Sequence, residues 1–129
     1  MLNDPLAAAL AKIFNAEKVG KREVLLRPAS KMIKKVLDLM NNHNYLGSFE
    51  EETDDRGGML KVNLLGTINK CGVIKPRFST QKKDFEKWEK RYLPAKDFGI
   101  ILVSTPQGIM THNEAKEKNT GGKLLAYCY

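Results

Sequence analysis

The chain is poor in cysteine. The cysteines present, Cys71 and Cys128, lie far apart, and neither belongs to a CxxC pair. This spacing argues against a zinc ribbon and against a disulfide framework, both of which need closely grouped cysteines. We therefore expect both to be small, buried, apolar side chains.

Long apolar runs are also lacking. No stretch approaches the roughly 20 residues that a helix needs to cross a bilayer, which excludes a helical membrane protein. The first residues, "MLNDPLAAAL", place Asp4 where a signal peptide would carry basic residues. With 42% hydrophobic and 29% charged residues, the composition is that of a folded soluble protein. The sequence predicts a mature chain that begins here and stays inside the cell.

Enzyme and metal motifs are scarce. Ser79 and Lys82 match SxxK, but the second serine or tyrosine and the KTG-like strand that accompany this motif do not appear in usable form. His43 and His112 lack further ligands at helical spacing, so each is expected to be a surface or capping side chain. The acidic run at 50–55 lacks the alternating oxygen ligands of a calcium loop and is expected to be a solvated hairpin tip. The sequence predicts no enzyme, no cofactor and no metal.

Positive charge is abundant. The chain of 129 residues has 22 Lys and Arg against 15 Asp and Glu, which gives a formal charge of +7. Its sequence pI is about 9.4. Such a balance is expected of a protein that meets a polyanion, although solvated lysine-rich faces produce it too. Charge alone therefore leaves nucleic-acid binding open.

The first part of the chain reads as helices alternating with short strands. Apolar residues recur at helical spacing from Asp4 to Glu17, where Asp4 and Pro5 suit a helix start. Ser30 is a suitable N-cap for a second helix. Strands are expected at "KREVLLRP", "YLGSFEEE", "MLKVNLL" and around residues 68–74, and "TDDRGG" reads as the hairpin loop between the second and the third.

The remaining chain reads as mainly strands. "FGIILVS" and "KLLAYCY" are expected to be buried strands, with a short helix between them that Thr111 and Glu114 begin as a capping box. Before them, an amphipathic segment carries Phe85, Trp88 and Tyr92 at helical spacing. The order of elements predicts an α+β fold of two small lobes. Residues 1–76 are expected to form an N-terminal lobe of α-β-α-β-β type, and residues 77–129 a C-terminal lobe that is mainly β with a short helix and carries the RNA-binding loop.

Several groups of residues suit RNA. Lys31, Lys34 and Lys35 follow a helix N-terminus, which favours phosphate, and Lys75 and Arg77 form a second basic point around a proline. An ordinary charged surface explains either cluster equally well. The stretch "STPQG" offers hydroxyls, an amide and a close backbone approach for irregular RNA, and its alternative is a structural turn.

The order "STPQGIMTHNEA" and then "NTGGKLLAYCY" resembles the small-subunit ribosomal protein eight family in its archaeal and eukaryotic form. "NDPLAAALAKIFNAE" and "RPASKMIKKVLDLM" resemble its first two helices, and "NKCGVIKPRFSTQKKDFEKWEKRYLPAKDFGIILVST" resembles its centre. The resemblance implies a non-enzymatic RNA-binding protein of the small ribosomal subunit, located in the cytoplasm. It would bind an irregular stem in the central domain of small-subunit rRNA, beside neighbouring ribosomal proteins, and support assembly. Some members also bind their own mRNA, which these residues do not decide.

The resemblance also implies site residues. The main RNA-reading loop falls on Ser104, Thr105, Pro106, Gln107 and Gly108. Further contacts fall on Ser30, Lys31, Gly121, Gly122 and Tyr127.

Two positions depart from the bacterial pattern, which typically has a serine at Pro106 and a glutamate at Lys123. An ammonium only donates hydrogen bonds, so we expect a phosphate contact at Lys123 in place of a base contact.

Two other functions compete with RNA binding. One is a basic protein-interaction module that docks a partner through Phe85, Trp88 and Tyr92. The other, much weaker, is a small hydrolase that uses Ser79 and Lys82. Specific RNA binding that survives moderate salt would favour the ribosomal interpretation over both.

Overall fold

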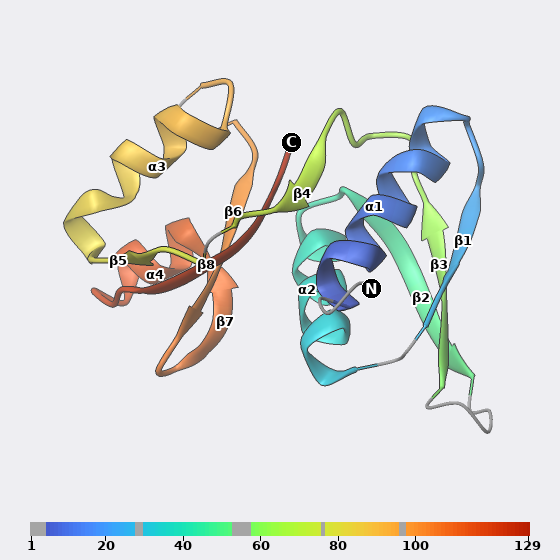
Figure 1. The fold of residues 1–129 in the computed structure, drawn as a ribbon, viewed down its shortest axis with the longest axis horizontal. Helices are drawn as coiled ribbons and strands as arrows, with labels where there is room; N and C mark the ends of the chain where they lie inside the picture. Colours follow the sequence, from blue (N-terminus) through green and yellow to red (C-terminus); the bar gives the residue numbers. More distant parts are fainter. Residues whose placement is uncertain (1–4, 28–29, 53–57, 76, 96–97) are drawn as a thin grey trace. The chain divides into compact units, whose positions relative to one another are not determined.

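The chain forms two compact units, Met1–Cys71 and Gly72–Tyr129 (Figure 1). The computed structural model describes residues 5–27, 30–52, 58–75, 77–95 and 98–129. Each unit combines helices with an antiparallel sheet, which confirms the predicted α+β fold of two lobes. The contacts divide the chain shortly before the boundary at 76 and 77, because the strand β4 (Cys71–Val73) pairs in the second sheet. That the lobes 1–76 and 77–129 are separate domains stays a prediction.

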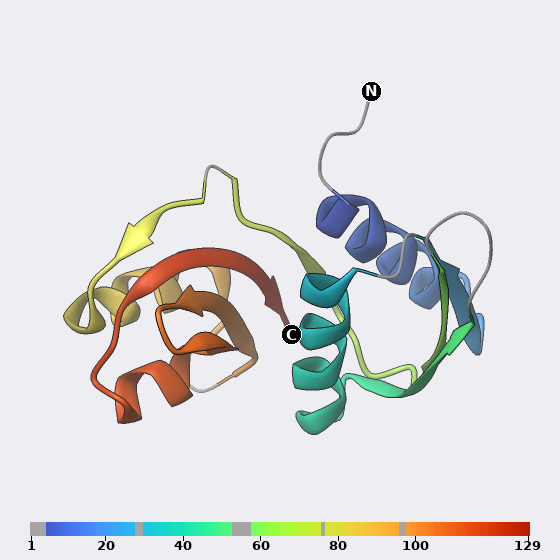
Figure 2. The same ribbon diagram turned by 90° about the horizontal axis from the view of Figure 1, so that it is seen from below.

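The first unit has two helices and a three-stranded sheet of order β1-β3-β2. Its elements are α1 (Pro5–Lys18), β1 (Glu23–Leu26), α2 (Lys31–Asn42), β2 (Leu46–Glu52) and β3 (Met59–Leu64). Both helices lie against one face of this sheet (Figure 2). These bounds agree with the predicted elements, while Asp4 and most of the "TDDRGG" loop lie outside the described residues.

Apolar residues at the predicted spacings build the core of the first unit. Central strand β3 buries Leu60, Val62 and Leu64 in alternation, which is the pattern of a strand with one buried face and one face toward solvent. The helices bury the stripes that their periodicity predicts. These helical core residues are Leu6, Leu10 and Ile13 in α1, with Ile33, Val36, Leu37 and Met40 in α2.

Ser30 caps α2 as predicted. Its Oγ accepts a hydrogen bond of 3.2 Å from the backbone N of Ile33, which satisfies one of the donors at the helix start. We expect Ser30→Ala to lower the free energy of unfolding by about 1 kcal/mol. Denaturant unfolding measures this, with Ser104→Ala, at an exposed strand position, as the control. Equal unfolding midpoints for the two variants would contradict the capping role.

The second unit is organised around its last strand. Its remaining elements are β5 (Ser79–Thr80), the 3-10 helix η1 (Lys82–Asp84), α3 (Phe85–Tyr92), β6 (Ile100–Thr105), β7 (Gly108–Thr111), α4 (His112–Glu117) and β8 (Gly122–Cys128). The sheet order is β4-β8-β6-β7, and β5 also pairs with β8. Three strands therefore depend on β8 for backbone hydrogen bonds.

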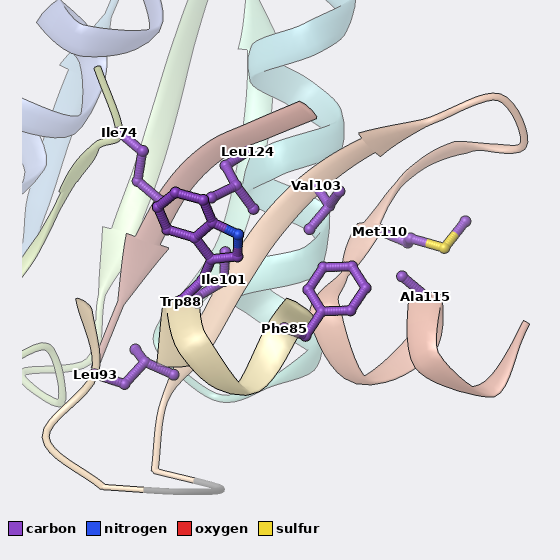
Figure 3. Packing of buried hydrophobic residues seen from close by; sticks show 9 residues of the cluster. All are labelled: Ile74, Phe85, Trp88, Leu93, Ile101, Val103, Met110, Ala115 and Leu124. Carbon is purple, nitrogen blue, oxygen red and sulfur yellow. The ribbon is translucent and has the colours of Figure 1, made fainter. Parts of the chain in front are cut away.

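The core of the second unit lies between α3, α4 and one face of its sheet (Figure 3). Phe85 and Trp88 of α3 are 0% and 6% exposed and pack against Val103, Met110 and Leu124. The hypothesis that this segment docks a partner is wrong for these two residues, because its apolar face is used inside the unit.

Two sequence-based expectations about single residues have opposite outcomes. Cys71 and Cys128 are buried free thiols, as predicted. His112 is fully buried, so the expectation of a surface or capping side chain is wrong. Its Nδ1 accepts a hydrogen bond of 3.1 Å from the backbone N of Ile101 of β6.

Among the described residues, no helix is long and apolar enough to cross a membrane.

Candidate nucleic-acid interface

The segment Ser104 to Gly108 is a tight hairpin turn between β6 and β7 (Figure 1). Thr105 pairs with Gly108 across the hairpin, and Pro106 and Gln107 form the turn between them. The Thr105 Oγ1 donates to the Gly108 carbonyl at 2.8 Å and accepts from the Gln107 backbone N at 3.1 Å. Gly108 has a φ of 120°, which favours glycine. The turn is thus held by its own hydrogen bonds.

This arrangement divides the predicted loop residues by role. Thr105 is 8% exposed and its hydroxyl is used within the turn, so it shapes the turn. Ser104, Pro106, Gln107 and Gly108 are exposed. The groups that can reach a ligand are therefore the Ser104 hydroxyl, the Gln107 amide and the turn backbone.

A polar row crosses the sheet beside the turn. Lys123 on β8 pairs with Ser79 on one side and with Ser104 on the other. Residues directly opposite in an antiparallel pair point to the same face, with Cβ atoms about 4.5–5.5 Å apart. All three side chains are exposed. We call Ser79, Lys123 and Ser104 the polar row: an ammonium between two hydroxyls.

Gly121 and Gly122 allow the strands that carry the polar row to approach each other. A Cβ on Gly121 would lie 2.3 Å from the Thr80 carbonyl oxygen, and one on Gly122 would lie 2.1 Å from the Ser104 carbonyl oxygen. Only glycine fits such a close backbone approach. The role that the structure gives these two residues is to position Lys123 next to Ser79 and Ser104.

The other predicted residues of the second unit are not part of the polar row. Tyr127 is half-buried and its ring lies 5.5 Å from that of Tyr92 and 6.3 Å from that of Tyr129, between centroids. It therefore belongs with the aromatic residues near α3. Lys75 and Arg77 are exposed on the segment between β4 and β5. On either side of these two residues, the Ile74 backbone N donates to the Leu125 carbonyl of β8 and the Leu124 backbone N of β8 donates to the Phe78 carbonyl.

The remaining predicted residues gather at the start of α2 in the first unit. Lys31 and Lys35 are exposed, and Ser30 is the N-cap. Lys34 forms an ion pair with Glu51 of β2, so part of its charge is compensated locally. Of these lysines, Lys31 and Lys35 have the most charge to offer an anion.

A buried polar cluster that joins α3 to α4 was not predicted from the sequence. Glu89 is 3% exposed, and its Oε1 contacts the Lys116 ammonium and lies 3.3 Å from His112 Nε2. Since His112 Nδ1 accepts a backbone hydrogen bond, the proton of the neutral ring lies on Nε2, toward Glu89. One signal was present in the sequence. Glu89 follows Phe85 by one helical turn, on the buried side of α3.

A basic α+β protein that presents an ammonium between hydroxyls beside a rigid hairpin turn has the features of a nucleic-acid-binding protein. The family model described as Ribosomal protein S8 matches residues 4–129, and the chain belongs to this family. It is a structural constituent of the small ribosomal subunit in the cytoplasm, where it binds rRNA and neighbouring ribosomal proteins, and it is not an enzyme. The resemblance to the family is thus confirmed, while the archaeal and eukaryotic form stays a prediction.

Proposed function

We propose that this chain is of the archaeal and eukaryotic type and binds an irregular stem in the central domain of small-subunit rRNA. The observation that carries the proposal is the polar row, in which Lys123 lies in register between Ser79 and Ser104 with all three side chains exposed. The hairpin turn continues this surface with Pro106, Gln107 and Gly108.

The groups of this surface divide the work of recognition. The Lys123 ammonium attracts a phosphate, which positions the RNA without reading its sequence. The hydroxyls of Ser79 and Ser104 and the Gln107 amide both donate and accept, so they suit base edges and riboses that an irregular stem exposes. Thr105 keeps the turn in one conformation through its two hydrogen bonds. Binding then loses little conformational entropy on the protein side.

The basic residues elsewhere supply attraction that does not depend on RNA sequence. We assign this role to Lys31 and Lys35 at the start of α2, with a smaller share for Lys34 because Glu51 compensates it. Lys75 and Arg77 have the same role beside β8. Ser30 contributes through the helix start that it caps. Gly121 and Gly122 contribute by holding the polar row together, and Tyr127 by packing near α3.

The same surface suits an mRNA. A messenger that folds into a stem with the same irregular core would present the same groups to Ser104 and Lys123. We propose that the protein's own mRNA, where it contains such a stem, is bound in this way.

Removing the Ser104 hydroxyl tests the proposed site. We expect Ser104→Ala to weaken binding to the irregular central-domain stem by about 1–2 kcal/mol, roughly 5- to 30-fold in Kd, because one polar contact to the RNA is lost. A fluorescence titration at several salt concentrations measures it, with a fully paired stem as the reference RNA.

Lys35→Gln is the matched control variant. It should weaken binding to both stems alike and reduce the salt dependence, since its contribution is electrostatic. The site assignment fails if Ser104→Ala leaves the preference for the irregular stem unchanged. The proposed function fails if the unmodified protein shows no preference between the stems.

A further inference from the structure

At α3, the cationic side chains of Arg91 and Lys87 lie over aromatic rings and form a second positively charged surface. The rings of Phe78 and Trp88 stack with centroids 4.8 Å apart and an angle of 27°, and Tyr92 continues the series 6.3 Å from Trp88. The guanidinium of Arg91 lies 5.2, 5.6 and 5.5 Å from the centroids of Phe78, Trp88 and Tyr92. The ammonium of Lys87 lies 5.0 Å from the Trp88 ring. We call Arg91, Lys87 and these rings the α3 platform.

The α3 platform holds its cations in place while leaving their donors available. A guanidinium whose face rests on aromatic rings keeps its N–H groups at the edge, where they can bind a phosphate in bidentate fashion. Arg91 and Lys87 are exposed, and the part of the chain that the structure describes gives neither a carboxylate partner. Their charge is therefore available to a ligand.

The surroundings of the platform favour an anionic partner. Lys83 and Lys90 are exposed nearby, whereas Glu89 on the same helix faces inward and is compensated by Lys116. Among the described residues of η1 and α3, the acidic residues left on this surface are Glu86 and Asp84. The local excess of positive charge matches the charge of an RNA strand.

The chemistry of the platform favours RNA over an acidic peptide. A carboxylate would use only the edge of the guanidinium. A nucleotide uses more of the surface, because its phosphate binds the edge while an unpaired base stacks on the open face of the guanidinium or on a ring rim. The rings beneath Arg91, of which Trp88 is buried, hold the guanidinium in place for such stacking.

The platform lies on the other side of the second sheet from the polar row. Val103 packs with Phe85 and Trp88 on the side of α3, and its neighbour Ser104 points to the opposite side because successive strand residues alternate. RNA groups that contact Ser104 therefore do not contact Arg91 at the same place.

We propose that the α3 platform is a second RNA contact, at which Arg91, assisted by Lys87, binds the phosphate and the unpaired base of an rRNA segment separate from the irregular stem. This inference rests on the proposed function, in that it takes rRNA as the ligand. It adds a site to the residues assigned above, and it gives a use to the orientation of α3, whose apolar side faces inward and whose cations face outward.

Footprinting on full small-subunit rRNA tests the second contact. With the whole protein, we expect hydroxyl-radical protection of the irregular stem and of one further segment. Arg91→Gln should remove the protection of the further segment only, and should weaken binding to the full rRNA by about tenfold while changing binding to the isolated stem less than about twofold. Arg91→Lys retains the charge without the planar fork and should restore less than half of the lost protection.

Lys90→Gln is the matched control, since it removes an exposed charge from the same helix without touching the rings. It should leave the further segment protected. Thermal unfolding of each variant checks that α3 stays folded. The inference is overturned if Arg91→Gln keeps both protections, or if it abolishes binding of a neighbouring ribosomal protein while the rRNA footprint is unchanged. Failure of the proposed function would appear separately, as loss of protection at the irregular stem in the unmodified protein.

Discussion

Replacing Gly122 with alanine is expected to destabilise the second unit by about 3 kcal/mol or more and to abolish specific RNA binding. The added Cβ would lie 2.1 Å from the carbonyl oxygen and 2.8 Å from the carbonyl carbon of Ser104. Both are backbone atoms of a paired strand, so no side chain can rotate away to make room. The strands must separate at the pair of Ser104 and Lys123, and the polar row is lost with them.

Denaturant unfolding and titration with the irregular stem measure the two effects. Gly108→Ala is the matched control, because Gly108 has a φ of 120° and no atom within 4 Å of an added Cβ. That variant tests backbone strain alone, for which we expect about 1–2 kcal/mol. If Gly122→Ala unfolds at the same denaturant concentration as Gly108→Ala, the close approach of the strands is not what requires glycine.

Removing the buried carboxylate of Glu89 is expected to destabilise the protein by about 3 kcal/mol. Glu89→Ala leaves the buried His112 ring without the carboxylate 3.3 Å from its Nε2 and leaves the Lys116 ammonium without its partner. It also creates a cavity between α3 and α4. Lys116 is 31% exposed and can turn toward water. We therefore expect the loss in the free energy of unfolding to lie at the lower end of the range for a broken buried ion pair.

The fluorescence of Trp88, the one tryptophan of the chain, reports the docking of α3 during unfolding. Glu89→Gln keeps the size and an acceptor oxygen and should recover at least half of the loss. Lys116→Ala removes the other partner from a more exposed position and should have a smaller effect than Glu89→Ala. An unchanged unfolding midpoint for Glu89→Ala would mean that apolar contacts alone hold α3.

Local patterns predict the first unit well. The stripe of α2, its cap at Ser30 and the alternation of β3 are all properties of neighbouring residues, and all are present. The second unit depends more on pairing between distant segments. Strand β5 has 2 residues and β7 has 4, which is too short for a period to be recognised. A structural turn at "STPQG" could therefore be predicted as an alternative, but not the strand β7 that makes it a hairpin.

The candidate site shows the same limit. Ser104 and Lys123 could be selected from the family resemblance, but their position opposite each other, with Ser79 on the far side, follows from strand register. Register is decided by the whole sheet and has no local mark in the sequence. The expectation for His112 is wrong because titratable residues are usually exposed. Here the backbone N–H of Ile101 and the Glu89 carboxylate lie against its two ring nitrogens, so the ring can be buried.

The central place of β8 affects when the protein can fold during its synthesis. The strands β4 and β5 precede it in the chain and pair with it in the sheet, while β6 pairs with the preceding β7 on one side and with β8 on the other. The first unit has all its strands early and can fold while translation continues. In the nascent chain, the apolar β6 has β7 on one side and stays unpaired on the other until β8 emerges, and a chaperone can bind it during that interval. The RNA-binding surface is thus the last part of the molecule to mature.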